Sequence, residues 1–94
     1  MWKVLQQAGA DVVLTGHEHF YERFEPIDGM REFIVGTGGI SHYEFRDKPH
    51  PSSAARHTGT LGVLALELKE SSYSWEFVPA FPTTFKDTGT DECH

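Results

Sequence analysis

Two alternating segments constrain the fold of this 94-residue chain more than any other feature. Apolar side chains recur at every second position in both segments, which is the period of a β-strand with one buried face. Only Glu70 and Ser71 separate the segments, so we predict a β-hairpin over residues 60–79, although its turn lacks the usual glycine. The alternating apolar residues are Leu64, Leu66 and Leu68 in the first segment, and Tyr73, Trp75 and Phe77 in the second.

The three rings of the second segment have two interpretations. Large rings on one strand face bury much apolar area, which indicates a core. A platform for stacking nucleic-acid bases is the alternative. Fourteen acidic and eight basic residues give a formal charge of −6, which nucleic-acid phosphates would repel. We therefore expect a core and no nucleic-acid partner.

The N-terminal third predicts a helix end and two strands. Residues 1–8 carry apolar side chains at helical spacing, without a capping residue at their start, and Gly9 is a suitable C-terminal cap. The chain is thus expected to open within a fold. Ala10 to Thr15 predicts a buried strand of a mixed or parallel sheet, since its apolar run is continuous. A loop with a tight Asp28-Gly29 turn follows, and then a second strand over Arg31 to Thr37.

The remaining segments show no sustained periodicity. We expect a long surface loop over residues 40–59 and a polar, extended tail over 80–94 that frays. The whole chain then forms one α/β domain, 1–94, of mostly β-strands with a short N-terminal helix and long loops. Its parts are a helix end at 1–8, a strand-turn-strand unit at 10–39, the loop, the hairpin at 60–79 and the tail.

Several functional classes lack their sequence signature. No apolar run approaches the roughly 18 residues of a membrane-spanning helix, and residues 1–7 are too short and polar for a signal peptide, so no membrane partner is expected. A single cysteine, Cys93, excludes an internal disulfide and identifies no compartment. The glycines in Gly36-Thr37-Gly38-Gly39 could cradle phosphate, but the Lys-Ser/Thr of a P-loop is missing. A turn with positive φ or close backbone approach is the preferred interpretation.

Two histidines, His17 and His19, directly follow the first predicted strand and Gly16. Ligand sites of open α/β sheets lie at the carboxyl ends of strands. In an extended backbone these two imidazoles would project to one side, where they could bind one cation or two neighbouring ones. Imidazole suits zinc, iron, manganese and copper. His50 and His57 are interpreted as surface histidines, whereas His42 follows the glycine turn and is a possible accessory or substrate-side residue.

The residues around this turn resemble a known family. Asp-Val-Val-Leu-Thr-Gly-His-Glu-His over residues 11–19, followed by Phe-Tyr-Glu-Arg, is similar to the last metal-binding motif of calcineurin-like metallophosphoesterases. The Tyr21-Glu22-Arg23 extension is most similar to the purple acid phosphatases. The segment 33–39, the predicted hairpin and Asp87-Thr88-Gly89 also resemble the C-terminal part of these enzymes.

This resemblance implies a β-sandwich flanked by helices and a two-metal site that hydrolyses phosphate esters, with Zn, Fe, Mn or Mg as the metal ions. His17 would ligate one metal and His19 the other. Two such cations activate a bound water and clamp the phosphoester. The family's other motifs, an Asp-x-His, a Gly-Asp-x-x-Asp and a Gly-Asn-His-Asp/Glu, do not occur in this sequence. We therefore expect a partial metallophosphoesterase β-sandwich that is inactive alone and has no certain catalytic residue.

Two alternatives remain open. The chain could be a non-catalytic oligomeric module with an opportunistic metal site, or a subunit that supplies the last motif to a separate chain. A partial sandwich would leave an apolar face uncovered, and monomers rarely expose large apolar patches. We therefore expect a homo-oligomer, with a symmetric dimer as its simplest form.

Overall fold

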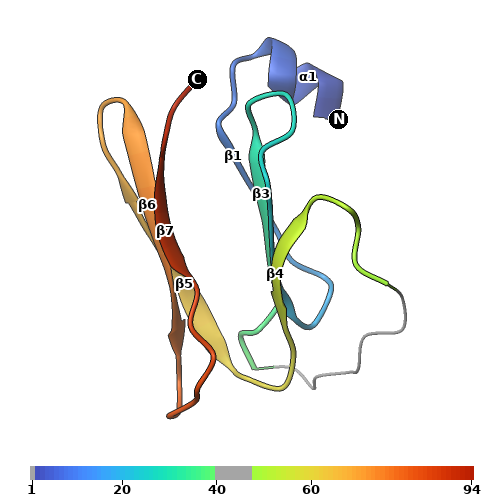
Figure 1. Ribbon diagram of the computed structural model, residues 1–94, viewed down its shortest axis with the longest axis vertical. Helices are drawn as coiled ribbons and strands as arrows, with labels where there is room; N and C mark the ends of the chain where they lie inside the picture. The colour runs from blue at the N-terminus through green and yellow to red at the C-terminus, as the bar shows by residue number, and fades with distance from the viewer. Residues whose placement is uncertain (1, 40–47) are drawn as a thin grey trace.

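Two β-sheets face each other in two layers, and one short helix lies at the N-terminus (Figure 1). The computed structural model describes residues 2–39 and 48–94. A four-stranded sheet, here the first sheet, has the strand order β1-β3-β2-β4, and a three-stranded second sheet has the order β5-β6-β7. The predicted architecture of mostly β-strands with a short N-terminal helix is confirmed. The elements are α1 (Trp2–Gln7), β1 (Val12–Thr15), β2 (Tyr21–Phe24), β3 (Arg31–Val35), β4 (Ser53–His57), β5 (Gly62–Leu68), β6 (Ser72–Pro79) and β7 (Thr88–Glu92).

The helix α1 ends at the glycine that the sequence indicates. Gly9 has a φ of 82°, its N–H donates to the Gln6 carbonyl, and the Ala10 N–H donates to the Leu5 carbonyl. These two bonds form a Schellman motif, in which a left-handed residue satisfies the last carbonyls of a helix. The predicted end of the helix and its cap are both confirmed.

The first sheet is mixed, as predicted, because β1 and β3 run parallel. Between them in sequence lies β2, which pairs antiparallel with β3 and was not predicted. Asp28 and Gly29 both have positive φ and form the tight turn that joins β2 to β3, a conformation that Asp-Gly favours. The strand-turn-strand prediction for residues 10–39 thus missed a strand, since Glu22 and Arg23 hide the short apolar pattern of β2.

The prediction of a buried first strand is wrong in position. β1 is an edge strand of the first sheet, and its Leu14 side chain is 57% exposed. Val12, on the same face, packs against the aromatic core. The continuous apolar run therefore corresponds to the edge strand β1, which packs against the core at Val12 but not at Leu14.

The hairpin prediction for residues 60–79 is confirmed by β5 and β6, which pair in continuous antiparallel register from Gly62↔Pro79 to Leu68↔Tyr73. The prediction of a fraying tail over 80–94 is wrong, because β7 pairs with β6. Gly89 explains part of this pairing: a Cβ at this position would overlap the Trp75 ring. The polar composition of the tail concealed a strand whose small residue fits over a large one.

The predicted loop over residues 40–59 is also wrong in part, because β4 pairs antiparallel with β2. Its residues lack an alternating apolar pattern, so the pairing left no signal in the hydropathy. On the partner strand, the buried Glu22 lies beside Arg56, with 3.2 Å between Oε2 and Nε. A side-chain ion pair and the backbone ladder therefore replace apolar burial at this edge.

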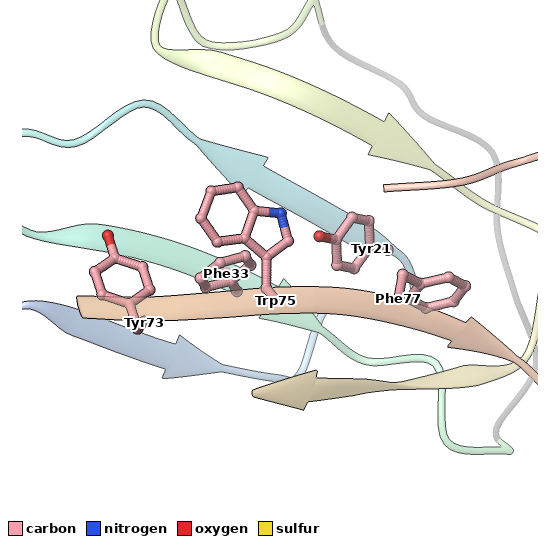
Figure 2. Close-up of a cluster of buried hydrophobic side chains, with 5 residues drawn as sticks. All are labelled: Tyr21, Phe33, Tyr73, Trp75 and Phe77. Atoms are coloured by element: carbon pink, nitrogen blue, oxygen red, sulfur yellow. The ribbon is translucent and has the colours of Figure 1, made fainter. Parts of the chain in front are cut away.

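Five aromatic side chains fill the space between the two sheets (Figure 2). Tyr21 and Phe33 come from the first sheet, and the other three come from β6. The rings of Tyr21 and Phe77 lie 4.8 Å apart, and those of Phe33 and Trp75 lie 5.6 Å apart. The aromatic stripe on Tyr73, Trp75 and Phe77 is thus a core, as predicted.

A buried polar network crosses between the sheets beside this core; we call Tyr21, Arg23 and Asp87 the inter-sheet network. The Tyr21 hydroxyl donates to Asp87 Oδ2 at 2.5 Å, while Arg23 Nε and Nη2 donate to the two Asp87 oxygens at 2.8 and 3.0 Å. Burial, and then the Asp87 hydrogen bond, raise the pKa of Tyr21. The Asp87 hydrogen bond also raises the pKa of Arg23. Tyr21 therefore stays a neutral donor and Arg23 a cation.

Arg31 makes a second connection between the sheets. Its Nη2 donates to Asp91 Oδ2 at 2.8 Å and its Nε to the Tyr73 hydroxyl at 3.2 Å. The guanidinium groups of Arg31 and Arg23 lie 4.6 and 5.1 Å from the centre of the Trp75 ring. Both cations thus gain a π-face as well as a carboxylate.

Acid is expected to weaken the fold through Asp91 and Asp11. The Arg31 hydrogen bond holds the pKa of Asp91 below 3.8, and the backbone N–H of His94 does so for Asp11. A carboxylate whose pKa is lower in the folded state contributes stability above its unfolded pKa and loses it as the pH falls through the folded value. Urea unfolding from pH 7 to pH 2 should show this loss below about pH 4. The Asp91→Asn chain should show less of it, by up to about 1 kcal/mol for so exposed a pair.

No helix in the described ranges, 2–39 and 48–94, combines the length and apolar character needed to cross a membrane.

Candidate functional site

The segment from Gly16 to Phe20, here the histidine turn, leaves β1 at its carboxyl end and leads into β2. The Glu18 N–H donates to the Gly16 carbonyl at 2.8 Å, and the Phe20 N–H donates to the Glu18 carbonyl at 2.9 Å. Each bond spans two residues and closes a very tight turn. His17, at the centre of the first, has a φ of 72°, which is strained for a residue other than glycine.

Gly36 allows the histidine turn to lie against the end of β3. A Cβ at Gly36 would overlap the Glu18 carbonyl oxygen, and the Gly36 N–H donates to the Phe20 carbonyl at 3.1 Å. Since β1 and β3 are parallel, their carboxyl ends lie at the same end of the first sheet. This close backbone approach confirms the preferred interpretation of the glycine run.

Thr37 connects this end of the first sheet to the second. Its side chain is buried, its Oγ1 donates to the Gly62 carbonyl at 2.8 Å, and the Gly62 N–H donates to the Thr37 carbonyl at 3.0 Å. The glycine run therefore positions a connection between the sheets and the support of the histidine turn. Residues 40–47, which include the accessory candidate His42, lie outside the described residues.

The two candidate ligands differ in exposure. His17 is exposed and His19 is half-buried. Both imidazoles would project to one side only on an extended backbone, and this expectation is wrong, because residues 17–20 bend. The two tight turns, and not the alternation of a strand, determine where the imidazole rings of His17 and His19 lie.

The other described histidines lie elsewhere and have their own contacts. His50 Nδ1 lies 2.7 Å from Ser52 Oγ. The His57 ring stacks on Phe85 with 4.2 Å between centroids. His94 Nδ1 lies 2.5 Å from Asp11 Oδ1. Within residues 2–39 and 48–94, no group of three or more His, Cys, Asp or Glu side chains is placed to hold a metal ion.

β2, which follows the histidine turn, is held by side-chain contacts on both of its faces that the sequence does not predict. Tyr21 and Arg23 point into the inter-sheet network, whereas Glu22 faces Arg56 on β4. Sequence reasoning named Asp87-Thr88-Gly89 only as part of a resemblance and did not pair it with β2. An isolated acidic residue near the C-terminus carries no local sign of a buried cationic partner.

Cys93 has the features of a structural thiol. It packs at the margin of the aromatic core, and its backbone N–H donates to the Ser71 carbonyl. Burial, with the neighbouring Asp11 carboxylate, raises the pKa of Cys93. A raised pKa disfavours the thiolate that nucleophilic chemistry requires.

A scan against protein-family models, a search of curated proteins and a search of solved structures each find no match for this chain.

Proposed function

We propose that this chain is the C-terminal part of a dinuclear-metal phosphoesterase, to which it contributes His17 and His19 as metal ligands. The observation that carries the proposal is the histidine turn itself. It stands at the carboxyl end of β1, a frequent place for ligand sites in sheets that contain parallel strands. Its strained φ at His17 is of the kind that clusters at functional sites.

The described residues do not complete such a metal centre. Two imidazoles supply at most two of the ligands, and structural metal sites generally use about four from the protein. The remaining ligands would come from beyond the described residues or from another polypeptide. Phosphoester hydrolysis therefore requires more than this turn, and no step of that reaction is assigned to a residue of this chain.

A second candidate is a non-catalytic oligomeric module, and the apolar side chains on one open side of the sandwich favour it. Leu14 is 57% exposed and Leu68 is 73% exposed, although both lie on the inward faces of their sheets. In this case metal binding at the histidine turn would be incidental.

Metal binding at the histidine turn is testable without activity. Paramagnetic Mn²⁺ is expected to broaden the imidazole NMR signals of His17 and His19 before those of His50, His57 and His94. His17→Asn retains a residue that tolerates positive φ while removing the imidazole. It should lower the Mn²⁺ affinity by about tenfold, with the same result for His19→Asn.

His50→Asn is the matched control, since it removes an exposed histidine that lies outside the turn and should leave the affinity unchanged. Equal broadening of all the histidines would refute the metal-ligand assignment. In a parallel assay with p-nitrophenyl phosphate and added zinc, manganese or iron, the chain alone should not exceed the rate of the metal alone. Hydrolysis that disappears in His17→Asn would instead show a self-sufficient enzyme.

A further inference from the structure

An apolar groove opens between the edge strands of the two sheets. Leu14 and Val35 line it from the first sheet, and Leu64 and Leu66 line it from the second. β1 and β5 are both terminal strands of their sheets. The apolar side chains on their inward faces therefore line the open side of the space between the two sheets. Edge strands with an exposed apolar face are templates for pairing with another chain.

Among residues 2–39 and 48–94, the backbone N–H and C=O groups of β5 that have no partner are those of its leucines. Lys69 N–H donates to Ser72 O, and Ala80 N–H donates to Leu61 O, so odd-numbered residues of this segment bond toward β6. Gly62 bonds away from β6, to Thr37. Because these directions alternate along a strand, Leu64, Leu66 and Leu68 direct their N–H and C=O groups to the open edge. We call these three residues the leucine edge.

The sequence of the leucine edge is self-complementary. Leu-Ala-Leu-Glu-Leu over residues 64–68 has leucines symmetrically placed around Leu66. A two-fold axis at Leu66 would place Leu66 opposite its own copy and Leu64 opposite Leu68 of the copy. Glu67 would then face Ala65, and Lys69 would face Val63, so no like charges would stand directly opposite.

The edges formed by β7 and β4 fit a second copy less well. The inward face of β7 carries Asp91, which already pairs with Arg31. β4 carries Arg56 and His57 and exposes no large apolar side chain. On β5, by contrast, Leu68 is 73% exposed on the inward face, and the Thr37–Gly62 bonds end the free edge just before Leu64. The accessible length thus coincides with the symmetric segment.

We propose that two copies of this chain form a symmetric dimer by antiparallel pairing of β5 with β5 about Leu66. The second sheets of the two copies join into one continuous sheet, with the leucine edge at its centre. The backbone groups of the leucine edge then bond across the axis. The leucine side chains form one apolar stripe that extends the groove across both copies.

Sedimentation equilibrium of the 94-residue chain tests this assembly. We expect a reversible monomer–dimer equilibrium that Leu66→Asp weakens by at least about a hundredfold, since two carboxylates would then oppose each other on the axis. Circular dichroism of the variant monitors the fold. A monomer at every concentration up to the solubility limit would overturn the proposal, as would a dimer indifferent to a folded Leu66→Asp chain.

Val63 tests the register without touching the leucine edge. Its side chain is 59% exposed and faces the outer side of β5, where it would stand opposite Lys69 of the copy. Val63→Asp should tighten the dimer by about threefold to tenfold, because two opposite-charge pairs form, and Val63→Lys should loosen it by a similar factor. Equal effects of both substitutions would reject pairing about Leu66.

Disulfide trapping locates the axis directly. Directly bonded residues of antiparallel strands have Cα atoms about 5.5 Å apart, which is within the range of a disulfide. In a Cys93→Ser background, Leu66→Cys should therefore oxidise to a covalent dimer. Ala65→Cys should not, since its two copies would be diagonal neighbours. Trapping at position 65 in preference to 66 would contradict the proposed register.

Discussion

Replacing Asp87 with alanine is expected to destabilise the chain by about 3–5 kcal/mol, which could remove most of the stability of a small domain. Asp87 is buried and accepts hydrogen bonds from Tyr21 and from two nitrogens of Arg23. Without it, the buried guanidinium keeps only the exposed Glu25, whose Oε1 lies 4.0 Å from Arg23 Nη1, and the Tyr21 hydroxyl loses its acceptor. Most of the loss in unfolding free energy arises because the Arg23 guanidinium and the Tyr21 hydroxyl stay buried without their partner, and less from the lost attraction to Asp87.

Urea unfolding at neutral pH measures this effect, and Glu67→Ala provides the control. Glu67 also pairs with a cation, since its Oε1 lies 3.3 Å from Lys69 Nζ, but both side chains are mostly exposed. Its loss should cost less than about 1 kcal/mol. Removing both charges with Arg23→Met and Asp87→Ala should be less harmful than Asp87→Ala alone. If the double variant is instead the least stable, the buried charge of Arg23 without Asp87 does not explain the effect of Asp87→Ala.

Replacing Gly36 with alanine is expected to displace the histidine turn and to cost about 3 kcal/mol, the upper end for an overpacked site. The added Cβ would meet the Glu18 carbonyl, which is backbone and cannot rotate away. The Gly36–Phe20 hydrogen bond would lengthen with it. The imidazole signals of His17 and His19 should therefore shift, and Mn²⁺ should broaden them less.

Gly38→Ala is the matched control for this prediction. Gly38 belongs to the same glycine run, but a Cβ there would meet no atom of residues 2–39 and 48–94 within 4 Å. Its substitution should leave both the NMR signals and the unfolding midpoint close to those of the original chain. Similar losses at positions 36 and 38 would mean that the run needs backbone flexibility, and not the close approach at Gly36.

The sequence predicts those elements whose pattern is local. The alternation in residues 60–79 required only its own period, and Asp28-Gly29 and Gly9 carry conformational preferences that need no partner. β4 and β7 were missed because their pairing depends on distant residues: Arg56 lies beside Glu22, and Gly89 fits over Trp75. Neither relation leaves a periodic mark on the segment that bears it.

The candidate site shows the same division. The sequence identifies His17 and His19 and places them after a strand, and the fold agrees with that placement. It does not predict that His17 takes a positive φ or that residues 17–20 bend, since both depend on Gly36 approaching from another strand. The support from Asp87 was also missed, because the separation of 64 residues from Arg23 gives no local signal.

That separation has a consequence for the order in which the chain becomes structured. The hairpin of β5 and β6 closes over a few residues, so its formation is fast. Arg23, on the strand that follows the histidine turn, gains its buried carboxylate partner only after the chain has been synthesised as far as Asp87. During synthesis, the segment that carries the two histidines therefore emerges before the carboxylate that fixes its position.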